Sequence, residues 1–162
     1  GDAAAVLNAL YTNEIHIATT ACLYKRELLE QVGGWDTSVV LDDWVLNVRL
    51  FRTFQTPSDF CYVDEDLFLY RLHGSSTVSN VSRLLNISVE AAQAYVPPPL
   101  LARSRANLYW SAGQRLLGQG NLAGAARYFW QSQATDFDLR RVAELASKGL
   151  IKLSEAQKRG RG

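Results

Sequence analysis

Residues 32–46 read VGGWDTSVVLDDWVL and carry the clearest signals of local structure in this chain. Gly33-Gly34 ends a short helix predicted over 25–32, because glycine adopts the left-handed C-cap conformation without a Cβ penalty. One residue of Asp42-Asp43 then caps a second helix, which we expect to run to about Phe54, and acidic residues at its start suit the helix dipole. The stretch therefore predicts two helices separated by a glycine turn.

Apolar runs on both sides of this stretch are rich in β-branched and aromatic residues, which favour strands. We predict a buried strand over 15–23 and two short strands over 60–63 and 67–72. An alanine-rich segment at 3–10 is helix-prone. Together these elements predict an α/β unit over residues 1–80.

After residue 80 the sequence is helical in pattern. We predict a helix over 84–95, which the proline-rich run at 96–99 ends, because proline lacks the N–H that a helix interior needs. Apolar residues at helical spacing on both sides of a glycine break at 118–120 indicate an antiparallel pair of helices. The sequence therefore predicts a domain boundary at residue 80 and an all-α tail over 81–162, within which the proline run is a further candidate seam.

Residues 113–130 resemble the turn and second helix of a tetratricopeptide unit. Only one such unit is visible, and arrays of these repeats need about three units for stability. We therefore interpret the tail as helices packed on the preceding domain. The alternative is a non-catalytic helical module whose role is to dock a protein partner.

The composition is that of a globular protein, with 48% hydrophobic and 20% charged residues among 162. The net charge of +1 gives no field that would attract nucleic acid. No run of 18 apolar residues exists, so we expect no membrane span in this chain. Separately, we expect a cytoplasmic location, with or without association to a membrane. The chain has no methionine and begins with Gly1, and we interpret it as a fragment.

Four phrases in order carry a resemblance to a known family. They are ACLYKRELL (21–29), VGGWD (32–36), DDWVL (42–46) and LFLYRLHGSS (67–76). In this order and with these gaps they resemble the second half of a family 2 glycosyltransferase of the GT-A type. The resemblance implies the C-terminal, acceptor-side half of a GT-A nucleotide-diphospho-sugar transferase fold over residues 1–80, followed by the helical tail.

The resemblance also implies roles for particular residues. Asp43 matches the carboxylate that takes the proton from the acceptor hydroxyl, while Asp42 stands where the family usually has Glu and would bind the acceptor. His73 would contact the diphosphate or its divalent cation, and neutral imidazole is a competent metal ligand. The remaining expected substrate-binding residues are Trp35 and Trp44, as an apolar wall for a sugar ring, and Arg71, Ser75 and Ser76 beside His73.

Each of these assignments has a structural alternative in the residues alone. The Asp42-Asp43 pair suits the start of a helix without any catalytic role. Trp35 and Trp44 suit a hydrophobic core equally well, and a single histidine such as His73 is commonly structural. His16, within an apolar run, is expected in the core.

The resemblance implies an enzyme that moves a sugar from a nucleoside diphosphate sugar to a hydroxyl of a glycan or lipid acceptor. Inversion of the anomeric carbon and dependence on Mn²⁺ or Mg²⁺ are implied with it. The acidic residues that bind the metal, and the elements that hold the nucleotide, would precede residue 1. We therefore expect this chain to be inactive by itself.

Overall fold

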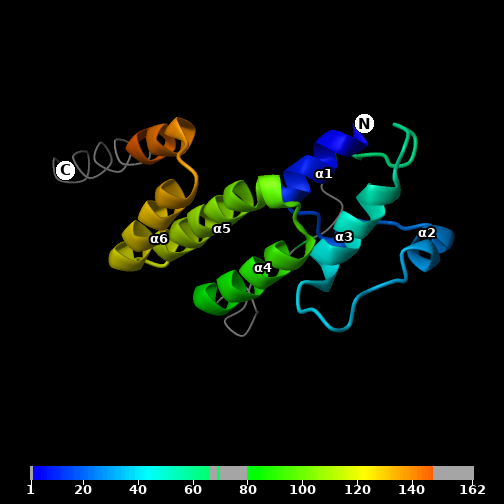
Figure 1. The fold of residues 1–162 in the computed structure, drawn as a ribbon, viewed down its shortest axis with the longest axis horizontal. Coiled ribbons are helices and arrows are strands. Elements are labelled where there is room, and N and C mark those ends of the chain that lie inside the picture. Colours follow the sequence, from blue (N-terminus) through cyan, green and yellow to red (C-terminus); the bar gives the residue numbers. More distant parts are fainter. Residues whose placement is uncertain (1, 66–68, 70–79, 148–162) are drawn as a thin grey trace.

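The computed structural model describes residues 2–65, 69 and 80–147 (Figure 1). Within that part, residues 139–147 are helical but carry no label. The labelled elements are, in order, α1 (Ala3–Tyr11), the 3-10 turn η1 (Thr19–Ala21), α2 (Arg26–Gln31), α3 (Asp42–Thr53), α4 (Val81–Tyr95), α5 (Pro98–Gly118) and α6 (Leu122–Thr135).

The predicted α/β fold is wrong, because the described part of the chain contains helices and connecting segments but no strand. Residues 15–23 contain η1 and form no strand. Instead, the carbonyl of Ile17 accepts a hydrogen bond from the side chain of Asn47 at 3.1 Å. Residues 60–63 are irregular, and 67–72 lie almost wholly outside the described residues. β-branched residues favour strands only where another strand supplies a pleated surface to pack on.

The predicted helices are confirmed, including those of the tail as far as residue 147, where the described part ends. The glycine turn after α2 is also confirmed: Gly33 and Gly34 have φ angles of 77° and 68°. The N–H of Gly34 donates to the carbonyl of Leu29 at 2.8 Å. Arg49, on α3, donates to the carbonyls of Val32 and Gly34, so α3 holds this turn in place.

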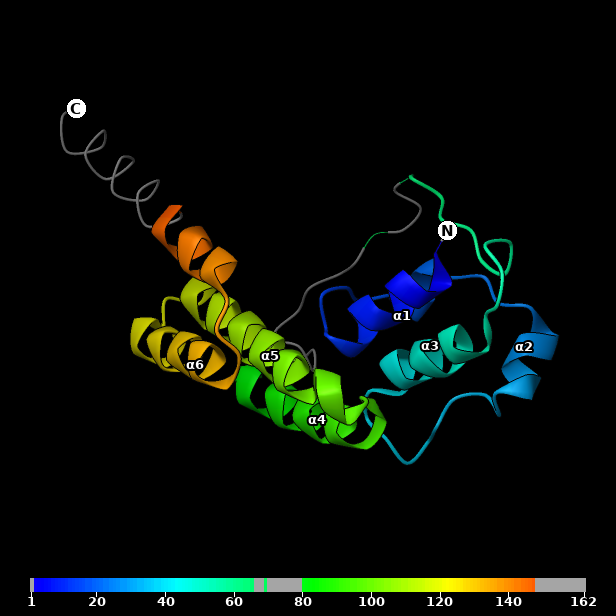
Figure 2. The same ribbon diagram turned by 45° about the horizontal axis from the view of Figure 1, so that its top comes forward.

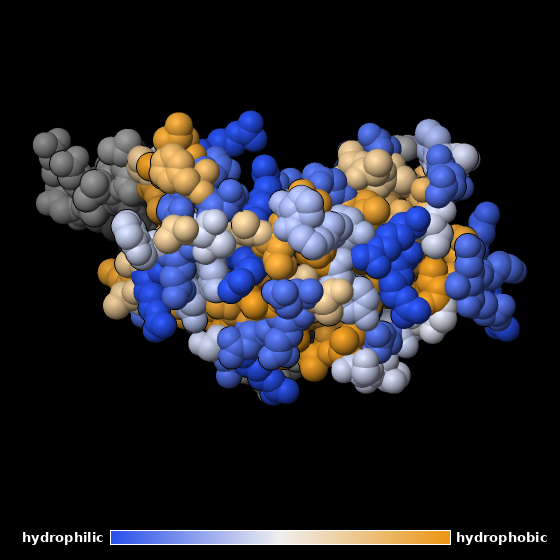
Figure 3. All heavy atoms as spheres, viewed as in Figure 1, coloured by the Kyte–Doolittle hydropathy of each residue, from blue (hydrophilic) through white to orange (hydrophobic). Residues whose placement is uncertain are grey.

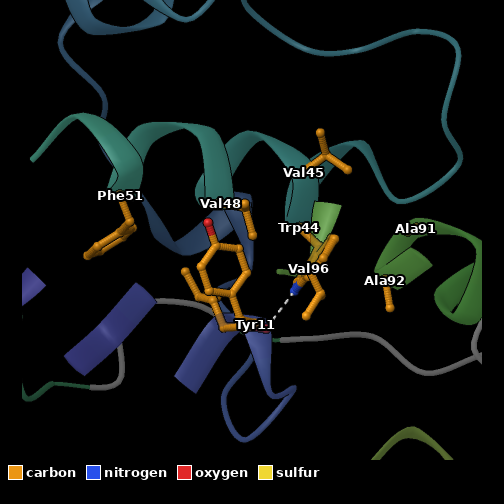
Figure 4. Close-up of a cluster of buried hydrophobic side chains, with 9 residues drawn as sticks. Tyr11, Trp44, Val45, Val48, Phe51, Ala91, Ala92 and Val96 are labelled. Carbon is orange, nitrogen blue, oxygen red and sulfur yellow. Dashed lines mark hydrogen bonds between the residues drawn. The ribbon is translucent and has the colours of Figure 1, made fainter. Parts of the chain in front are cut away.

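One hydrophobic core joins elements from both sides of the predicted boundary at residue 80 (Figure 4). α1 lies against α3 and α5, and α4 packs on both α3 and α5 (Figure 2). The burial of this apolar surface is the main force that holds α1, α3 and α4 together. The buried members of this core are Leu10, Tyr11, Trp44, Val45, Val48, Phe51, Ala91, Ala92 and Val96.

Arg52 fastens the same three helices from outside the core. Its Nε donates to the hydroxyl of Tyr11 on α1 at 2.6 Å, and its Nη2 donates to the carbonyl of Tyr95 on α4 at 2.6 Å. The guanidinium also lies 5.4 Å from the centre of the Tyr11 ring, within the range of a cation–π contact. One side chain of α3 thus contacts both of its neighbours.

Asp36 connects the loop after α2 to the end of α4. Its carboxylate accepts hydrogen bonds from the hydroxyl and N–H of Ser38 at 2.6 and 3.0 Å, and from the hydroxyl of Tyr95 at 2.9 Å. These donors lower the pKa of Asp36, with the Ser38 hydroxyl as the largest cause. The same bond from Tyr95 to Asp36 is the main cause that raises the pKa of Tyr95.

We expect Asp36→Asn to lower the melting temperature at pH 6.5 more than at pH 3. A carboxyl group whose pKa is lowered by folding stabilises the folded state above its unfolded pKa of about 4, and this contribution is lost as pH falls through the lower folded value. Thermal unfolding followed by circular dichroism at the two pH values checks this. An equal difference at both would mean that the ionised carboxylate contributes nothing.

The helices α5 and α6 form an antiparallel pair with a close contact near the middle. A Cβ built on Gly113 of α5 would lie 2.6 Å from Cε1 of Phe129 on α6. The Phe129 ring in turn lies against Trp110, with centroids 4.7 Å apart. Glycine at position 113 therefore allows the two helices to approach.

Gly113→Ala should lower the free energy of unfolding by about 1–2 kcal/mol, because the added methyl group forces the Phe129 ring away from Trp110. Gly118→Ala is the matched control, since a Cβ at Gly118 meets no atom within 4 Å. It should raise stability by about 0.5 kcal/mol, as expected for glycine to alanine within a helix. Urea titrations of both variants check the prediction, and a stable Gly113→Ala variant would contradict it.

No described helix is both long and apolar enough to cross a bilayer.

Candidate functional site

A cavity of about 710 Å³ lies where the N-terminal elements meet α4 and α5. This volume is within the range of about 300–1,000 Å³ that small-molecule sites occupy. The loop after α1 and the start of α3 supply its acidic residues, Glu14, Asp42 and Asp43, and its histidine, His16. From α4 and α5 come Leu84, Leu85, Leu108 and Ala112, with Arg115 also bordering the space.

Asp43 is oriented by the start of α3. The N-cap residue is Leu41, whose side chain cannot accept a hydrogen bond, so the predicted capping by an aspartate is not observed. Asp42 and Asp43 are instead the first two helical residues, and each accepts from the following N–H, at 2.9 and 2.7 Å. In Asp43 this bond occupies Oδ1, which leaves Oδ2 available to the cavity.

His16 lies beside that second oxygen. Its Nε2 is 3.6 Å from Oδ2 of Asp43, so the two form an ion pair when the imidazole is protonated. The His16 side chain is 63% exposed and that of Asp43 is 29% exposed. The expectation that His16 belongs to the core was wrong, since no strand forms there to bury it. A partly exposed carboxylate beside an imidazole can accept a proton from a bound hydroxyl and pass it on.

The backbone carbonyl of Asp43 is held by the buried side-chain amide of Asn47. Asn47 is 2% exposed, and its Nδ2 donates to the carbonyl of Asp43 at 2.9 Å as well as to Ile17. Its Oδ1 accepts from the hydroxyl of Tyr24 at 3.2 Å. Burial is the main cause that raises the pKa of Tyr24 above its usual value, so this hydroxyl stays a donor. Asn47 thus ties the segment that carries His16 to the helix turn that carries Asp43.

The two tryptophans of the expected sugar wall lie in different environments. Trp44 is 4% exposed, and its Nε1 donates to the carbonyl of Leu10 at 3.1 Å (Figure 4). It packs edge-to-face on Tyr95, and only a small part of it borders the cavity. Trp35 is 43% exposed, rests edge-on against Tyr24, and does not line the cavity. The structure therefore does not bring the two indoles together.

The other predicted site residues, Arg71, His73, Ser75 and Ser76, lie outside the described residues. Among the residues that are described, no three His, Cys, Asp or Glu side chains are arranged to hold a metal ion. His16 and Asp43 alone do not make such a site. The expected divalent cation and the role of His73 thus stay predictions.

His16 and Arg115 are cavity residues that the sequence did not indicate. His16 is 27 positions before Asp43, and their approach depends on the path of the loop after α1. That loop begins at Asn13, which adopts a left-handed conformation with a φ of 54°. Arg115 lies in a helix expected only to pack, and no local pattern relates it to α3.

No family model matches the chain, and comparison with curated proteins and with solved structures gives no significant match. The resemblance to family 2 glycosyltransferases therefore rests on the four phrases alone.

Proposed function

We propose that this chain provides the acceptor side of a sugar-transfer reaction, with Asp43 as the general base. The observation that carries the proposal is the free Oδ2 of Asp43, which lies beside His16 in a cavity of ligand size. The proposal concerns the chemistry of this site and does not require the α/β fold, which the described chain lacks.

In the proposed reaction the acceptor hydroxyl lies against Oδ2 of Asp43. The oxygen of that hydroxyl attacks the anomeric carbon of the donor, its proton passes to the carboxylate, and the nucleoside diphosphate leaves. Oδ1 stays bonded to the N–H of Trp44 throughout, so the carboxylate keeps its orientation. When its Nε2 carries no proton, His16 offers a path by which the proton then leaves Oδ2 of Asp43.

In this proposal the nucleoside diphosphate sugar binds to residues outside the described part of the chain. The full-length protein that contains this chain, incubated with a panel of nucleoside diphosphate sugars, Mn²⁺ and hydroxyl acceptors, should release nucleoside diphosphate from at least one donor. Release is measured with a coupled enzyme assay. Absence of release from every donor would overturn the proposal.

A second candidate function is the helical interaction module. Large apolar side chains of α6 and of the segment that follows it are exposed, namely Leu122, Trp130, Phe137, Leu139 and Val142. Figure 3 shows apolar surface in the region of that segment. Apolar side chains that lie exposed on one part of a protein commonly mark an interface where they adjoin one another. Under this candidate, Asp43→Asn would change no activity, while Trp130→Ala would weaken the binding of a partner.

A further inference from the structure

The acidic and imidazole groups of the cavity come from the N-terminal elements, whereas α4 and α5 contribute a group of apolar side chains together with Arg115. Asp42, Asp43 and His16 provide charge and hydrogen-bonding capacity from the N-terminal elements. α4 and α5 contribute Leu84, Leu85, Leu108 and Ala112. A ligand that fills this space contacts both kinds of surface.

Three polar residues that line the cavity, Ser88, Asn107 and Asn13, are already engaged within the protein, while Ser111 and Arg115 of α5 also line it. Ser88 donates its hydroxyl to the carbonyl of Leu84 at 2.8 Å, one turn back along α4. Asn107 donates to the carbonyl of Thr12 at 2.7 Å and accepts from Arg141 at 2.6 Å. Asn13 donates to the hydroxyl of Ser104 at 2.8 Å. These side chains have little capacity left for a ligand.

We infer that the cavity binds an acceptor that carries an apolar group next to its reacting hydroxyl. This inference rests on the proposed function, since it places that hydroxyl at Asp43. The apolar group then lies against Leu84, Leu85 and Leu108. If the acceptor carried hydroxyl groups on every side, those that face the leucines would have no hydrogen-bond partner. Each such hydroxyl would weaken binding.

Two small glycosides that differ only in the aglycone test the inference. Phenyl β-D-glucopyranoside and methyl β-D-glucopyranoside present the same sugar, so a difference in affinity reports on the apolar group. Burying the phenyl ring should tighten binding by at least about tenfold. Ligand-observed NMR titration of the full-length protein measures both dissociation constants without any need for transfer. Equal affinities would overturn the inference.

Matched variants on α4 locate the binding. Ser88→Phe fills the apolar side of the cavity and should remove the preference for the phenyl glycoside. Ser82→Phe makes the same change at an exposed position outside the cavity and should preserve it. Leu84→Ser makes the wall polar without adding volume, so it serves if Ser88→Phe does not fold, and it should lower the preference at least about threefold. A preference that survives all of these changes would overturn the inference.

The outcomes also separate this inference from the proposed function. Asp43→Asn removes the base but leaves the leucines in place, so the phenyl preference should persist while transfer is lost. A preference located in the cavity, in a protein that transfers no sugar, would count against the proposed function. Transfer that proceeds equally well to methyl and phenyl acceptors would count against the inference alone.

Discussion

Under the proposed function, Asp43→Asn should lower kcat of the full-length protein by about 10²–10⁴-fold, the usual effect of removing a general base. Asparagine has the same shape and can still accept the hydrogen bond from the N–H of Trp44. The start of α3 should therefore persist, with a loss of about 0.3–1 kcal/mol from the weaker interaction with the helix dipole. Donor affinity should change little, since the base acts on the proton and not on ground-state binding.

Two neighbouring substitutions provide the controls. Asp42→Asn removes the adjacent charge at the same helix end and should have a smaller effect on kcat than Asp43→Asn. His16→Gln removes the imidazole 3.6 Å from Oδ2 and should lower kcat by about tenfold, because the base itself remains. Steady-state kinetics on the three variants, with circular dichroism to verify folding, decide the matter. Near-normal turnover of Asp43→Asn would leave the acidic pair with a role only in helix stability.

Trp44→Ala should destabilise the protein by about 3–5 kcal/mol, the typical cost of removing a large buried aromatic side chain. The indole contacts α1 through its hydrogen bond to Leu10 and α4 through the ring of Tyr95, so its loss opens a cavity between three helices. Small proteins are stable by only about 5–15 kcal/mol in total. The variant should therefore be partly unfolded at moderate temperature.

Trp35→Ala is the matched control, because Trp35 is 43% exposed and contacts Tyr24 at the surface. It should cost about 1 kcal/mol or less. Differential scanning calorimetry of both variants measures the two effects. Equal costs would mean that the burial of Trp44 does not hold the three helices together.

The helices were predictable because their signals are local. Gly33-Gly34 ends α2, and the acidic pair begins α3, through contacts between residues a few positions apart. The strands were not, because a β-branched run becomes a strand only when another segment pairs with it. Here the carbonyl of Ile17 accepts a hydrogen bond from the side chain of Asn47 and not from another strand.

The site was predictable only in part, for the same reason. The position of Asp43 follows from the start of a helix, but the approach of His16 depends on a loop conformation and on the network around Asn47. The lining from α4 and α5 depends on packing between distant segments, as in the contact between Ala92 and the core of α1 and α3. Such contacts leave no periodic pattern in the sequence.

α4 faces two ways. Ala91 and Ala92 complete the core with α1 and α3, while Leu84 and Leu85, near its other end, form a wall of the cavity. A graft of residues 1–80 onto another protein would therefore lose one side of the cavity together with part of its hydrophobic core. Recombination at the proline run would separate α4 from α5 and so divide the cavity wall. Exchange of parts between proteins can preserve this site only if α4 and α5 move together with the segment that carries Asp43.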